Sequence, residues 1–195
     1  MAGGDWTWLE IAKLSVAAAV PIVVVGLTLA VNRAGKRVED AQWASRKLIE
    51  RRIELFDQMA EPLNDLLCFF RLVGHFRAVT PPEAIQRKRT LDKLFYVNRV
   101  LMSEEFAARY QDFIATCFSP YQSVAHDARL RASAENQREE RGDDWRAEWE
   151  DLFVKQADDV ASITEVSRRY DELMEVFAAE VGVFSGAAGR GAVPA

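Results

Sequence analysis

The sequence contains few of the residues that usually carry chemistry. Cysteine occurs only at Cys68 and Cys117, and histidine only at His75 and His126. The chain also lacks a glycine-rich phosphate loop, an H-E-x-x-H zinc motif, a nucleophile elbow and a C-x-x-C pair. Two cysteines far apart in the chain exclude a disulfide framework and are typical of a reducing compartment. These absences predict no catalytic residue, no cofactor and no enzyme activity.

The two cysteines and the two histidines could in principle supply four ligands to a zinc ion. The intervals of 7 residues from Cys68 to His75 and of 9 residues from Cys117 to His126 match no compact zinc motif. Distant helices would also have to converge to complete such a site. We therefore predict no metal site, and we interpret the cysteines as core residues.

Positive charge is not in excess either, because the net charge of the chain is −5. A dedicated nucleic-acid binder would show a basic stripe. The densest basic run is Arg87, Lys88, Arg89 and Lys93, and no aromatic residues alternate with it on one helix face to stack on bases. We interpret this run as a solvated helix face and expect no nucleic acid among the partners.

A long uncharged run near the start of the chain is the strongest positive signal. Residues 14–31 carry no charged side chain. A helix of this length covers roughly 27 Å, which is close to the hydrocarbon thickness of a bilayer. Trp6 and Trp8 stand where an interfacial aromatic belt would lie. The sequence therefore predicts a short external N-terminus over 1–8 and a single transmembrane helix over 9–31.

Two other interpretations of the run remain. A buried helix of a soluble domain would need a large core around it. A signal peptide would have a passable cleavage site at Thr28-Leu29-Ala30, but it usually has a positive segment before the apolar stretch. Here the segment before the run is acidic, and Arg33, Lys36 and Arg37 follow it.

The same charge asymmetry predicts the topology. Basic residues flank membrane helices on the cytoplasmic side. We therefore expect the N-terminus outside the cell inner membrane and the bulk of the chain in the cytoplasm. Arg33, Lys36 and Arg37 are the residues predicted to contact lipid headgroups.

Small residues recur along the predicted anchor. Ala12, Ala19 and Gly26 are spaced seven residues apart, so they lie on one helix face. Helices in lipid associate through close backbone approach across small side chains. These three residues therefore predict self-association of the anchor and a homo-oligomer, although such residues are also common in membrane helices that stay apart.

The remainder of the chain is predicted to be helical, with three helices over 32–126. The first of these has an apolar seam with alternating steps of four and three residues, and Pro62 is expected to kink or break it near Gln58. Thr80 and Glu83 form a capping-box pattern at the next helix start, and Ser103 marks a third start. The seam residues are Ile49, Ile53, Phe56, Ala60, Leu63, Leu67 and Phe70.

The C-terminal part is predicted to contain one more long helix. Residues 127–142 have almost no large apolar side chains and are interpreted as a polar linker or a polar helical extension. Apolar residues at steps of four and three then predict a bundle helix over 143–182, with Trp145 and Trp149 in the core at its start. Residues 183–195 are small and predicted to be a disordered tail. The expected fold class is all-α, a transmembrane helix followed by an elongated cytoplasmic bundle, with no β-strand.

The stretches "RVEDAQWASRKLIERRIELFDQMAEPLNDLLCFF" and "TPPEAIQRKRTLDKLFYVNRVLMSEEFAARY" resemble uncharacterised bacterial membrane-anchored helical proteins. The resemblance covers about residues 33–131 and implies a bacterial origin. It implies no catalytic motif and no site residue.

Two functional classes fit these features. The first is an anchored interaction or scaffold module that assembles with itself or docks an unknown protein partner. The second is a membrane-disrupting effector of a bacterial defence or toxin system, which would act through oligomerisation of the anchor in the lipid bilayer.

Overall fold

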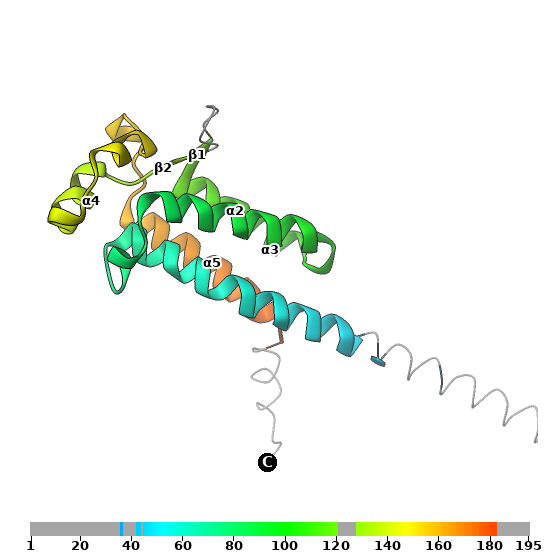
Figure 1. Cartoon of the computed structure of the whole chain (residues 1–195). Helices are drawn as coiled ribbons and strands as arrows, with labels where there is room; N and C mark the ends of the chain where they lie inside the picture. Colours follow the sequence, from blue (N-terminus) through cyan, green and yellow to red (C-terminus); the bar gives the residue numbers. More distant parts are fainter. Residues whose placement is uncertain (1–35, 37–41, 44, 121–127, 183–195) are drawn as a thin grey trace, which may run out of the picture. The chain divides into compact units, whose positions relative to one another are not determined.

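The computed structural model describes residue 36, residues 42–43 and residues 45–120 and 128–182 (Figure 1). The chain divides into two compact units, Met1–Lys47 and Leu48–Ala195. The predicted external N-terminus, the predicted transmembrane helix and the predicted tail lie outside the described residues. Within the described part, no helix is both long enough and apolar enough to cross a membrane.

The second unit is mostly helical, which confirms the predicted all-α class. Figure 1 shows α2, α3 and α5 beside the first helix of the bundle. The helical residues are 45–71 in the first helix, Pro81–Asn98 in α2, Glu104–Cys117 in α3, Ala134–Arg141 in α4 and Ile163–Glu180 in α5. Short 3-10 turns follow the first helix at Phe76–Ala78 and join α2 to α3 at Arg99–Leu101.

The buried face of the first helix matches the predicted seam only in its second half. Leu63 and Phe70 of the seam are buried, whereas Ile49 and Ile53 are 40% and 43% exposed, and Met59, which is not in the seam, is fully buried. The helix also continues through Pro62, so the predicted break is wrong. Burial of Met59 and Leu63 on either side of the proline offsets the missing backbone hydrogen bond. The buried positions of this helix are Leu55, Met59, Leu63, Leu66, Phe69 and Phe70, with Asp65 beside them.

The starts of α2 and α3 are confirmed where the capping patterns predicted them. The Glu83 carboxylate accepts hydrogen bonds from the Thr80 backbone N–H at 2.7 Å and from the Thr80 hydroxyl at 2.8 Å. The backbone hydrogen bond from Thr80 lowers the pKa of Glu83. The Ser103 hydroxyl accepts from the Phe106 N–H at 3.1 Å. Each side chain satisfies a donor that the first helical turn leaves without a partner.

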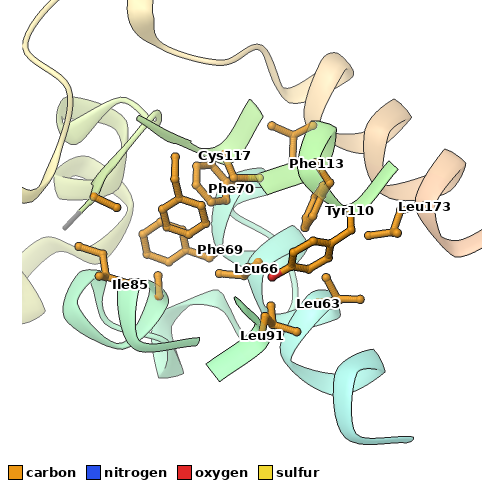
Figure 2. Close-up of a cluster of buried hydrophobic side chains, with 14 of the residues drawn as sticks. Leu63, Leu66, Phe69, Phe70, Ile85, Leu91, Tyr110, Phe113, Cys117 and Leu173 are labelled. Carbon is orange, nitrogen blue, oxygen red and sulfur yellow. The ribbon is translucent and has the colours of Figure 1, made fainter. Parts of the chain in front are cut away.

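The core lies where the first helix, α3 and α5 meet. Figure 2 shows Leu63 and Leu66 of the first helix, Tyr110 and Phe113 of α3, and Leu173 of α5 converging on one cluster. Aromatic rings extend this cluster between the helices. The Phe106 and Phe177 ring centroids are 4.6 Å apart, and those of Phe56 and Phe177 are 4.9 Å apart. Such ring pairs add to the stabilisation that burial of their area provides.

The predicted helix over 143–182 is wrong in its first half. Residues 142–152 form 3-10 turns, Phe153 bridges to Leu130, and the α-helix starts only at Ile163. Ser162 begins that helix, because its hydroxyl accepts from the Glu165 N–H at 3.1 Å. This S-x-x-E capping pattern sets the start of the α-helix at Ile163, although the apolar periodicity begins earlier in the sequence. Trp149 is nevertheless buried in the core, as expected, although in a 3-10 turn.

A short β-ribbon was also not predicted. β1 (Phe118–Pro120) pairs antiparallel with β2 (Ala128–Leu130), and Phe118 lies opposite Leu130. Phe118, Ala128 and Leu130 are all buried in the core cluster. Three-residue strands are too short to produce a visible alternation of apolar and polar residues.

Residues 127–142, predicted to be a polar linker or a polar helical extension, contain the helix α4, but part of it is packed into the bundle. Arg141 is only 3% exposed, and its guanidinium donates to the backbone carbonyls of Phe76 at 3.0 Å and Val79 at 2.7 Å. Its Nε donates to the Gln137 side-chain oxygen at 3.0 Å, and Gln137 donates to the Phe69 carbonyl at 2.9 Å. α4 is therefore tied to the end of the first helix and to the loop after it.

Arg141→Met should lower the free energy of unfolding by at least about 3 kcal/mol, because several buried acceptors lose their donor at once. The matched control is Arg146→Met, whose side chain is 69% exposed. It should change stability by no more than about 0.5 kcal/mol. Urea unfolding followed by tryptophan fluorescence measures both. Equal small effects would mean that α4 is not packed as described.

Candidate functional site

Three chain segments meet at one end of the bundle through Arg52. Its Nε donates to the Leu101 carbonyl at 2.7 Å, and its Nη1 lies 2.8 Å from Glu180 Oε2. The other carboxylate oxygen of Glu180 accepts from the Ser103 backbone N–H at 2.8 Å. We call these contacts the Arg52 clamp. It joins the start of the first helix, the turn between α2 and α3, and the end of α5.

The clamp is shielded from water. The Arg52 and Glu180 side chains are 23% and 7% exposed. A charged pair taken partly out of water stabilises a structure only when the remaining donors and acceptors are also satisfied. The Leu101 carbonyl and the Ser103 N–H provide these additional partners, so the ends of three helices are fixed to one another.

Exposed apolar side chains lie close in sequence to Arg52 and Leu101 of this clamp. Val97 and Val100, beside Leu101, are 70% and 90% exposed. Ile49 and Ile53 lie within one helical turn of Arg52, and Leu48 precedes Arg52 by four residues. The structure has nine exposed large apolar side chains among the described residues, and five of them lie within four residues of Arg52 or Leu101 in the sequence. We call Leu48, Ile49, Ile53, Val97 and Val100 the end surface.

Two ion pairs lie beside the end surface in the sequence. Arg51 forms an ion pair with Glu54 at 2.5 Å, and Arg99 forms one with Glu104. The core of a protein–protein interface is apolar and depleted of charged residues, and its rim is polar. The end surface was not predicted from the sequence, because periodicity assigned Ile49 and Ile53 to the core.

Most of the predicted membrane residues lie outside the described part of the chain. This applies to Ala12, Ala19 and Gly26 and to Arg33 and Arg37. Lys36 is described and is helical and exposed. The predicted self-association stripe and the predicted headgroup contacts therefore remain predictions.

The titratable residues considered for metal binding lie in different surroundings. Cys117 is completely buried, and burial raises the pKa of its thiol. His75 Nε2 lies 2.6 Å from Asp65 Oδ1, and Arg87 Nε donates to Asp65 Oδ2 at 2.6 Å. Within the described ranges, no group of three or more such side chains is arranged to hold a metal ion. His126 lies outside these ranges.

Asp65 links the loop after the first helix to α2. Burial alone would raise the pKa of Asp65, but hydrogen bonds from His75 and Arg87 and their charges lower it below its ordinary value. A lowered folded-state pKa means that the carboxylate stabilises the fold above its unfolded pKa of about 4. This contribution is lost as the pH falls through the lower folded value. The basic run from Arg87 to Lys93 was predicted to be a solvated helix face. Its first residue, Arg87, instead donates to the buried carboxylate of Asp65.

Asp65→Asn should be less stable than the wild type at pH 7, and the two free energies of unfolding should converge as the pH falls below about 4. The exposed Asp57→Asn variant serves as the control and should follow the wild-type curve. Urea midpoints measured across the acid range give both curves. A constant difference between wild type and Asp65→Asn down to pH 2 would contradict the assigned role.

Comparisons of the chain with protein-family models, with curated proteins and with solved structures find no match. The function proposed for the chain therefore rests on its own residues.

Proposed function

We propose that the chain is a single-pass membrane-anchored helical interaction module that self-associates and docks a protein partner. In this proposal the anchor spans the cell inner membrane and the bundle lies in the cytoplasm. The observation that carries it is the end surface, which exposes five large apolar side chains at one end of a bundle with a well-buried core.

The order of residues along the chain supports this proposal. The uncharged run ends at Val31, and the bundle unit starts at Leu48, which belongs to the end surface. The end surface is therefore at the end of the bundle where the chain arrives from the predicted anchor. Anchored copies that associate through Ala12, Ala19 and Gly26 would bring their end surfaces to high local concentration. A weak apolar contact is then sufficient to hold the copies together.

The basic residues after the run support the same arrangement. Arg33, Lys36 and Arg37 each gain about 1 kcal/mol beside an anionic leaflet, so they favour a cytoplasmic position for the chain that follows. We propose a lipid bilayer, a second copy of the chain and a protein as the partners, and no nucleic acid.

Self-association tests this function. In a membrane two-hybrid assay, Val100→Asp should reduce the signal at least about fivefold, since a charge would have to be buried at the contact. Ala19→Ile and Gly26→Ile should also reduce it, because bulk separates the anchors. The controls are Val24→Ile on another face of the anchor and Val73→Asp in the loop after the first helix, where Val73 is 42% exposed. Wild-type signals from Val100→Asp, Ala19→Ile and Gly26→Ile would contradict the proposal.

The effector alternative makes a different prediction in the same cells. A scaffold should be tolerated when overproduced, whereas an effector should collapse the membrane potential. A potential-sensitive dye measures this directly. If the wild type depolarises the membrane and Gly26→Ile does not, the effector function would be supported and the scaffold function contradicted.

A further inference from the structure

A second feature lies between α2, α3 and the β-ribbon. These elements line a half-open cavity of about 380 Å³. Small-molecule sites are mostly apolar cavities of about 300–1,000 Å³ with a few polar groups, so the volume is sufficient for a small ligand. Its apolar walls include Ile114 of α3, Phe118 and Pro120 of β1, and Ala128 of β2.

The polar side of the cavity is built from α2 and α3. Lys88 and Asp92 stand one helical turn apart, with Lys88 Nζ 2.8 Å from Asp92 Oδ2. The Tyr110 hydroxyl donates to the other oxygen of Asp92 at 2.8 Å. Burial, together with the charge and hydrogen bond of Asp92, raises the pKa of Tyr110, so its hydroxyl stays protonated. Both oxygens of Asp92 are thus engaged by the protein.

The cavity carries more positive than negative charge. Lys88 and Arg131 line it together with the single carboxylate Asp92. Lys88 has three N–H donors, and one is directed to Asp92. Arg131 donates from Nε to the Asp159 carbonyl at 2.8 Å and from Nη1 to the Ala115 carbonyl at 3.3 Å, which accounts for two of its five N–H groups.

The cations are also held in position. The Lys88 side chain is 15% exposed, and its ammonium lies 6.0 Å from the centre of the Phe118 ring. Two backbone carbonyls fix the Arg131 guanidinium. A cation that is already ordered loses little side-chain freedom when it binds an anion, which favours binding.

We propose that this cavity binds a small amphipathic carboxylate with an aromatic body. The carboxylate would accept hydrogen bonds from Lys88 and Arg131. The aromatic body would pack against Ile114 and Phe118. Binding at this site does not depend on the proposed function.

Two compounds of the same shape test the proposal. Isothermal titration calorimetry would be performed on the full chain in detergent micelles, with empty micelles as the blank. The ligands are 4-phenylbutyrate and its uncharged amide, 4-phenylbutyramide. We expect the carboxylate to bind at least about tenfold more tightly than the amide, which corresponds to about 1.4 kcal/mol.

Variants assign the binding to this cavity. Lys88→Gln keeps a donor for Asp92 but removes the charge, so the preference for carboxylate should fall to less than about twofold. Lys93→Gln is the matched control, because Lys93 is exposed on the same helix and does not line the cavity. Ala115→Trp adds bulk to the cavity wall and should lower the affinity for both ligands at least about tenfold.

Several results would overturn the proposal. They are no saturable binding to the wild type, equal affinity for the two ligands, or an unchanged preference in Lys88→Gln. Salt provides a test that needs no variant. Raising the ionic strength from about 0.05 M to about 0.5 M should lower the affinity for the carboxylate and leave the affinity for the amide unchanged. A carboxylate affinity that does not respond to salt would also overturn it.

Discussion

The position of Arg52 is the constraint on which the arrangement of the bundle depends. Four helices can bury the same apolar residues in more than one relative position, because apolar burial is not directional. The Arg52 clamp removes this freedom at one end by fixing Arg52, Leu101, Ser103 and Glu180 to one another. At the other side of the core, Arg141 acts in the same way on Phe76 and Val79.

Both arginines donate to backbone carbonyls. Their structural roles could therefore not be predicted from a sequence motif. A guanidinium has five donors in a fixed plane, so one side chain can serve carbonyls of several segments. The residues that provide those carbonyls are not restricted in type. Arg141 therefore looked like one more charge in a polar linker.

The parts of the fold that could be predicted are those set by local interactions. Thr80 with Glu83, and Ser103 alone, begin their helices within one turn of sequence, so α2 and α3 start where the sequence placed them. Long-range packing decided the rest. The apolar spacing of Trp149 and Phe153 suits a helix, but contact with β2 holds Phe153 in an extended conformation. Neither the end surface nor the cavity could be predicted, because both depend on which helices meet.

The two sites divide the bundle into surfaces of different chemistry. The end surface is apolar and has two ion pairs beside it in the sequence, which suits another protein or a second copy. The cavity between α2 and the β-ribbon combines apolar walls with ordered cations, which suits a small anion. The Arg52 clamp leaves the first available, since it buries Arg52 and Glu180 while the neighbouring valines and isoleucines remain exposed. Both surfaces are carried by the unit Leu48–Ala195.

The central claim is that the uncharged run anchors the chain with the bundle in the cytoplasm. Labelling in intact cells with a membrane-impermeant maleimide tests it most directly, with a cysteine placed at residue 3 in one variant and after Ala195 in another, both in a Cys68→Ser background. The account predicts labelling of the cysteine at residue 3 and protection of the one after Ala195 until the cells are opened. Release of the chain from membranes by carbonate, a mature N-terminus near Val31, or the opposite labelling pattern would contradict it.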